Sequence, residues 1–102
     1  MASRLELHER FCEILGNRNA YYNPPESVKM NYPCIRYVLS KPDIKKANNG
    51  IYQYMNRYEV VVIDPDPDSN IPSQLLNTFV LCSFDRTYKA NNLNHTVLTI
   101  YY

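Results

Sequence analysis

Three aspartates alternate with two prolines in the segment DPDPDS, and carboxylates at this spacing can bind a metal ion. Asp64, Asp66 and Asp68 match the first three ligand positions of an EF-hand calcium loop. The match then fails, because Ser69 stands where that loop requires glycine and Leu75 stands where it requires a bidentate glutamate. A metal site is therefore not the favoured interpretation.

The same carboxylates could act as a general acid and base, which requires one pKa raised by burial or by a close like charge. Prolines favour an extended, solvated segment, and the sequence offers no obvious partner histidine or nucleophile. A strand-to-helix turn explains every residue of the segment. Pro65 and Pro67 block strand pairing, Asp68, Ser69 or Asn70 caps a short helix, and Pro72 suits the first turn of that helix.

A second polar stretch, SFDRTYKANNLNH, contains an adjacent Asp85–Arg86 pair that can form an ion pair within a subunit or across an interface. His95 has no Cys or His neighbour at metal-ligand spacing. The odd number of cysteines and the lack of a CxxC motif indicate reduced, buried thiols at Cys12, Cys34 and Cys82. No Ser/His/Asp or Cys/His set stands out, so we expect no enzymatic activity, no metal and no cofactor.

Composition indicates one folded domain over residues 1–102, with 45% hydrophobic and 21% charged residues. The net charge is only +1, whereas a nucleic-acid-binding module usually carries a clear excess of basic residues. The chain has no apolar run near the roughly 20 residues of a membrane span, and its start lacks the apolar region of a signal peptide. The 10 tyrosines suit a sheet-rich domain with protein interfaces, whereas only 2 glycines argue against a phosphate-binding loop.

Periodicity predicts an amphipathic helix over residues 3–15, with His8 packing at the edge of its apolar side. The other expected elements are strands at 20–22, 34–39, 51–63, 79–84 and 94–102, a short helix at 71–77, and loops at 40–50 and 85–93. The short extended piece at 20–22 is followed by two prolines, so it should be an edge strand or a loop. The predicted fold class is α+β: a mainly antiparallel sheet of four to five strands, packed by the N-terminal helix and the second short helix, with a long hairpin arm.

Three segments, YPCIRY, RYEVVVIDPDPDSNIP and CSFDRTYKANNLNHTVLTIYY, resemble the small tail proteins encoded in the head–tail connection modules of long-tailed bacteriophages. These are variously called tail terminator, tail completion or minor capsid proteins. The resemblance runs over most of the chain, and its most specific parts are the acidic turn and the SFDR…NNLNH stretch. It implies a small α/β sandwich and a structural, non-enzymatic role.

The resemblance further implies a hexameric ring on the head-proximal end of the tail tube, which stops tube polymerisation and joins the tail to the head connector. The implied location is the neck of the virion. The implied partners are further copies of this chain, the tail tube protein and the connector or stopper protein, with at most non-specific DNA contact in the lumen and no membrane. The rival within this setting is a head-completion (stopper) protein or another head–tail connector component. The rivals from other classes are a small monomeric hydrolase and a nucleic-acid-binding module.

We expect the arm around residues 41–54 to contact a neighbouring subunit or the tube, with Lys45 and Lys46 facing a partner ring or the lumen. A second contact is expected near Asp85, Arg86 and Tyr88. The full set of expected interface residues is Lys41, Lys45, Lys46, Tyr52, Tyr54, Arg57, Asp85, Arg86 and Tyr88.

Overall fold

The computed structural model describes residues 4–25, 29–40 and 56–102. Its elements follow in the order α1 (Arg4–Leu15), β1 (Ala20–Tyr22), β2 (Cys34–Ser40), β3 (Arg57–Asp64), α2 (Ile71–Thr78), β4 (Cys82–Ala90) and β5 (Leu93–Tyr101). This confirms the predicted α+β class and the predicted order of helices and strands. The expected hairpin arm, and the first part of the strand expected at 51–63, lie outside the described residues.

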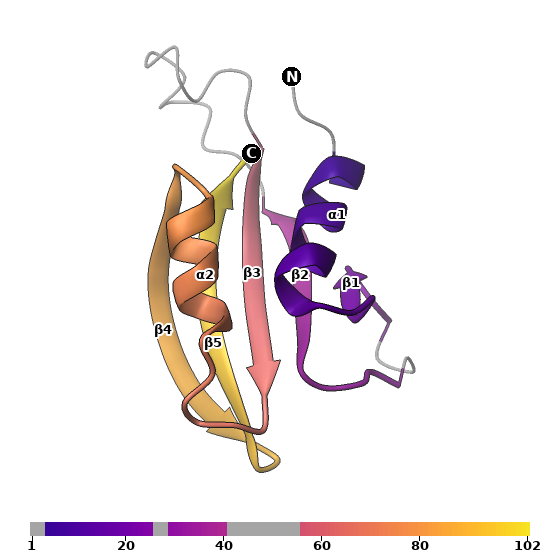
Figure 1. Ribbon diagram of the computed structural model, residues 1–102, viewed down its shortest axis with the longest axis vertical. Helices are drawn as coiled ribbons and strands as arrows, with labels where there is room; N and C mark the ends of the chain where they lie inside the picture. The colour runs from indigo at the N-terminus through magenta and orange to yellow at the C-terminus, as the bar shows by residue number, and fades with distance from the viewer. Residues whose placement is uncertain (1–3, 26–28, 41–55) are drawn as a thin grey trace.

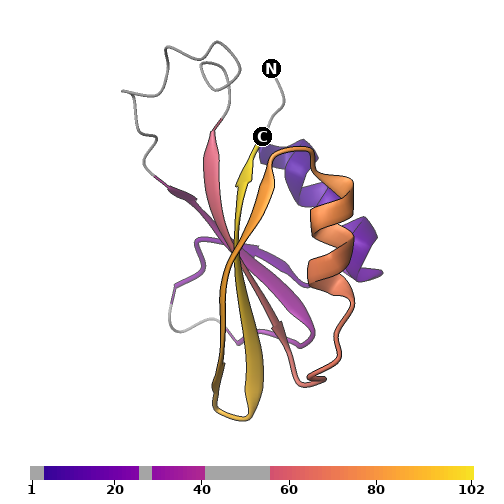
Figure 2. The same ribbon diagram turned by 90° about the vertical axis from the view of Figure 1, so that its left-hand side faces the viewer.

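The five strands form one sheet in the order β1-β2-β3-β5-β4, with β3 at its centre. The sheet is mixed, because β1 runs parallel to β2 while the other three pairings are antiparallel. Both helices lie on the same side of the sheet, α1 over β2 and β1 and α2 over β5 and β4 (Figures 1 and 2). Figure 2 shows the described parts of the connection from β1 to β2 on the opposite side.

Alternation along β3 explains the two apolar clusters. Tyr58, Val60 and Val62 face the helices and join the larger cluster with Leu7 and Phe11 of α1. The intervening residues point to the other face, where a smaller cluster contains Cys34, Val61, Ile63 and Val97. Each fully buried aliphatic side chain contributes about 1.5–3 kcal/mol. The run VVVI was expected to be covered on both faces, and its burial confirms that interpretation.

The helix α1 ends as its sequence predicts. Gly16 adopts a φ of +75°, and its N–H donates to the carbonyl of Cys12 at 2.9 Å. His8 lies at the apolar margin of the helix. Its Nδ1 is 2.7 Å from the hydroxyl of Tyr37, a residue of β2. His8 therefore packs against the sheet, as expected.

A strand was expected at 79–84 and is present, but its bounds are wrong, and the loop expected at 85–93 is wrong over most of its length. The strand β4 instead runs over Cys82–Ala90, and a turn at Asn91 and Asn92 joins it to β5. Two physical features make the extent of this strand hard to recognise from the sequence. Its register shifts between Phe84 and Arg86, which breaks the alternation, and most of its residues are exposed, so no apolar face marks it.

Candidate interaction surfaces

The acidic turn folds back on its own backbone. Asp64 Oδ1 accepts the N–H of Asp66 at 2.9 Å, and Asp66 Oδ1 accepts the N–H of Asp68 at the same distance. Ser69 Oγ then accepts the N–H of Ile71, the first residue of α2, at 3.3 Å. These successive side-chain-to-backbone bonds turn the chain from β3 into α2. They confirm the strand-to-helix interpretation of DPDPDS.

The turn is also tied to the sheet. Asn94 Nδ2 of β5 donates to the carbonyls of Asp64 and Pro65 at 3.2 and 3.3 Å. In the described part of the chain, no group of three or more His, Cys, Asp or Glu side chains is arranged to hold a metal ion. The contacts of the turn are thus those of an architectural element.

The side of the sheet opposite the helices, which we call the open face, carries most of the polar side chains of the strands. At one end it is covered, where Met30 and Tyr21 pack against the smaller apolar cluster. Elsewhere it presents charged residues, with Arg36 on β2, Glu59 on β3 and Arg86 on β4 all exposed. These three charged side chains are therefore accessible to solvent on the open face.

One hollow on the open face, of ≈ 300 Å³, lies over β2, β3, β5 and β4. Its lining includes Ser40, Arg57, Glu59, Asp85 and Thr99. Arg57 donates from Nε and Nη2 to Ser40 Oγ at 3.2 and 2.9 Å, which fixes its guanidinium beside β2. The hollow therefore has a positive side at Arg57 and a negative side at Asp85 and Glu59.

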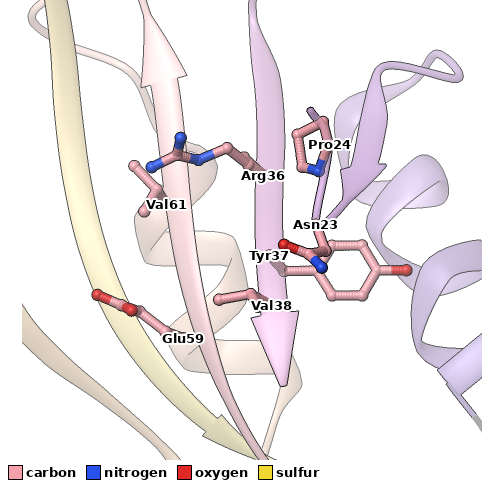
Figure 3. A pocket seen from close by; sticks show the side chains of 7 residues that line it. All are labelled: Asn23, Pro24, Arg36, Tyr37, Val38, Glu59 and Val61. Carbon is pink, nitrogen blue, oxygen red and sulfur yellow. The ribbon is translucent and has the colours of Figure 1, made fainter. Parts of the chain in front are cut away.

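A second hollow of ≈ 240 Å³ lies beside the first, and Glu59 lines both. Figure 3 shows Arg36 reaching across β3 above Val61, and Glu59 further along the same strand. The ring of Tyr37 points the other way, toward α1. Apolar Val38 and Val61 lie between the two charges. This pattern, in which opposite charges flank a small apolar floor, suits recognition of a protein surface.

The structure brings together only part of the expected interface set. Arg57 and Asp85 line the same hollow, and Arg86 Nη1 forms an exposed ion pair with Asp85 at 2.9 Å. Tyr88 lies further along β4, where its ring stacks on His95 with centroids 4.7 Å apart. The remaining residues of the set lie outside the described residues: Lys41, Lys45, Lys46, Tyr52 and Tyr54.

Sequence reasoning missed the contribution of Arg36 and did not assign Glu59 to a site. Arg36 is the one charged residue of β2 (CIRYVLS), and Glu59 directly precedes the apolar run of β3 (RYEVVVID). A charge beside apolar strand residues is a usable signal that its face meets solvent. Their common hollow was not predictable, because it depends on the pairing of β2 with β3, which places Arg36 opposite Val61.

The three thiols are poor nucleophiles in the folded protein. Burial raises the pKa of Cys34 to about 12 and that of Cys82 to about 11, and it also raises the pKa of Cys12. All three are free cysteines. Cys12 and Cys34 are buried as expected, whereas Cys82 is only partly buried. A thiolate is the reactive form, so these environments suppress cysteine chemistry.

Comparisons with protein-family models, curated proteins and solved structures return no match. None of the helices in the described residues is long and apolar enough to cross a membrane.

Proposed function

We propose that this protein is a structural subunit of a bacteriophage virion, a tail terminator that forms a hexameric ring on the head-proximal end of the tail tube. The observation that carries the proposal is the sequence resemblance, which is most specific at the acidic turn and at the SFDR…NNLNH stretch. In this structure the first segment is the turn between β3 and α2, and the second forms most of the β4–β5 hairpin.

The open face supports a role in protein assembly. Arg36, Arg57 and Arg86 alternate across it with Glu59 and Asp85, so the charges of the described strands form no continuous basic stripe there. A duplex binder needs such a stripe to neutralise successive phosphates. Interleaved charges instead favour a protein surface of complementary pattern, and they penalise wrong partners or wrong registers. The subunit would make non-specific DNA contacts at most.

A ring subunit makes heterologous contacts, in which one patch meets a different patch on the next copy. We propose that the open face supplies one of these patches. The mechanism is steric and associative: the ring covers the last tube ring, stops further addition of tube protein and offers a new surface to the head connector. The role requires no catalytic residue.

Deletion of the gene from its phage, followed by electron microscopy, tests the role. The proposal predicts overlong or irregular tails detached from heads. Tails of normal length beside heads that leak DNA would contradict it and would indicate a head-completion (stopper) protein. Particles of normal form and infectivity would exclude both roles.

Complementation of that deletion tests the surface. Arg36→Glu reverses a charge on the open face, and Arg10→Glu reverses an exposed charge on α1 as a matched control. We expect Arg10→Glu to restore tail length and Arg36→Glu to fail while remaining folded by circular dichroism. Restoration by both variants would show that the open face makes no essential contact.

A further inference from the structure

The strand β4 forms one edge of the sheet. It is nine residues long, and its residues from Ser83 to Lys89 are all exposed. Within the described residues no strand pairs with its outer side. An edge of this length presents unpaired backbone N–H and C=O groups, which is the template that another β-strand recognises.

The register shift between Phe84 and Arg86 divides β4 into two parts. The second part, residues 86–90, pairs regularly with β5 up to Ala90 opposite Leu93. The turn that follows has positive φ at both central residues, Asn91 (φ 53) and Asn92 (φ 62), as a tight hairpin requires.

The hairpin fixes the direction of the backbone groups. In an antiparallel pair, hydrogen-bonded and non-hydrogen-bonded positions alternate, and the pair next to a two-residue turn is hydrogen-bonded. Ala90 and Tyr88 therefore direct their backbone groups toward β5. Thr87 and Lys89 direct theirs away from the sheet, so both can pair with a further strand.

Tyr88 marks the centre of this available segment. Its ring lies nearly parallel to that of His95, at an interplanar angle of 12°, so one ring face is covered. The residue is nevertheless 42% exposed, since β4 is an edge strand and no described strand lies on its outer side. Half-covered aromatic rings of this kind form favourable cross-strand pairs.

We propose that two copies of this chain pair antiparallel along residues 86–90 of β4, about a two-fold axis at Tyr88. Thr87 then lies opposite the second copy's Lys89 and exchanges backbone hydrogen bonds with it. Tyr88 lies opposite Tyr88 of the second copy. The two tyrosine rings then continue the stack that each makes with its own His95. Arg86 lies opposite Ala90, a small side chain that leaves room for the guanidinium.

Self-pairing in this register is favoured because the residues at every opposed position are compatible. The opposed residues lie on the same face of the sheet, and no like charges stand directly opposite each other. A register centred on Thr87 would place Asp85 opposite Lys89. That register fails, because the irregularity before Arg86 leaves Asp85 on the open face, whereas Lys89 alternates onto the helix side.

The contact is short and belongs to the weak class of interfaces. Arg86, Lys89 and the strand irregularity restrict which partners can add to this edge, since charges and bulges are the usual protection against indiscriminate pairing. The inference concerns the isolated protein and does not depend on the proposed phage role.

Disulfide trapping in a Cys82→Ser background tests the register. Tyr88→Cys would face its own equivalent at a Cα separation of roughly 4.5 Å, within disulfide range. The matched control is Arg86→Cys, whose equivalents would be four positions apart, about 13 Å. We expect oxidation to yield a covalent dimer with Tyr88→Cys alone. Equal trapping of both variants, or trapping of Arg86→Cys alone, would overturn the proposal.

Sedimentation equilibrium without added cysteines gives a second test, at concentrations up to ~1 mM because weak contacts need them. Thr87→Pro removes an outward N–H that the monomer does not use, so the fold should persist. Thr87→Val is the control, since both variants lose the bond from Thr87 Oγ1 to the carbonyl of His95. We expect the wild type and Thr87→Val to dimerise and Thr87→Pro to stay monomeric. A monomeric wild type, or a dimeric Thr87→Pro, would overturn the proposal.

Discussion

The contact between α1 and the sheet can be tested at the hydroxyl of Tyr37. This side chain is 1% exposed, and its hydroxyl lies 2.7 Å from His8 Nδ1 and 3.5 Å from Arg4 Nη1. Tyr37→Phe deletes the hydroxyl and keeps the ring, so the edge contacts with Phe11 (5.0 Å) and Tyr58 (6.0 Å) remain. The change therefore isolates the polar link.

The expected cost follows from that geometry. One neutral hydrogen bond contributes a net ~0.5–1.5 kcal/mol, and the 3.5 Å contact with Arg4 lies at the limit of such bonds. We expect Tyr37→Phe to lower the free energy of unfolding by ~1 kcal/mol in urea titrations at pH 7.5, with an unchanged m-value. The control Tyr21→Phe, whose hydroxyl accepts an exposed N–H from Asn31, should cost less than ~0.5 kcal/mol. Equal losses in both variants would refute the assignment.

His8 adds a pH dependence to the same contact. Burial first, then the charges of Arg18 and Arg4, lowers the pKa of His8 from the ordinary value of 6.5. The unfolded chain then binds the proton more readily than the folded chain, so stability is fully present above about pH 6.5 and falls as the pH drops through that value toward the folded-state pKa. His8→Gln should flatten the stability profile between about pH 8 and 5.5. An unchanged slope would contradict this cause.

Three further outcomes are expected. Leu98 is 0% exposed, so Leu98→Ala should lower the free energy of unfolding by ~2–5 kcal/mol in urea titrations. Leu39 is 44% exposed, so Leu39→Ala should lower it by less than ~1 kcal/mol. Similar losses in both variants would contradict the assigned core. Asn92→Val should destabilise the protein by ~1–2 kcal/mol relative to Asn92→Gly, because φ is 62° there, and an equal Tm for both would refute the turn. Burial raises the pKa of Cys34 to about 12 and that of Cys82 to about 11, so both thiols should resist alkylation at pH 8 until urea unfolds the chain. Rapid labelling of these thiols in the folded protein would contradict this assignment.

The order of helices and strands was predictable, because most elements bury one face. The strand β3 is buried on both faces of the sheet, and its continuous apolar run VVVI indicated this. The extent of β4 was not predictable, because an exposed edge strand with a register shift has neither an apolar face nor a regular period. The acidic turn was interpreted correctly since its prolines and capping residues act locally, within a few positions.

The open-face hollows show the limit of sequence reasoning. Asp85 was expected at an interface because of its neighbour Arg86, and the structure adds Arg57 and Glu59 to its surroundings. That neighbourhood depends on the order of strands, in which β5 lies between β3 and β4. Strand order joins residues that are far apart in the chain, and no local pattern encodes it.

The most direct test of the proposed role is cryo-electron microscopy of the neck of intact phage particles. The account predicts a sixfold ring of this fold between the last tail tube ring and the connector, with the open face buried in a subunit contact. A ring bound to the portal side, or particles that lack this chain altogether, would contradict it.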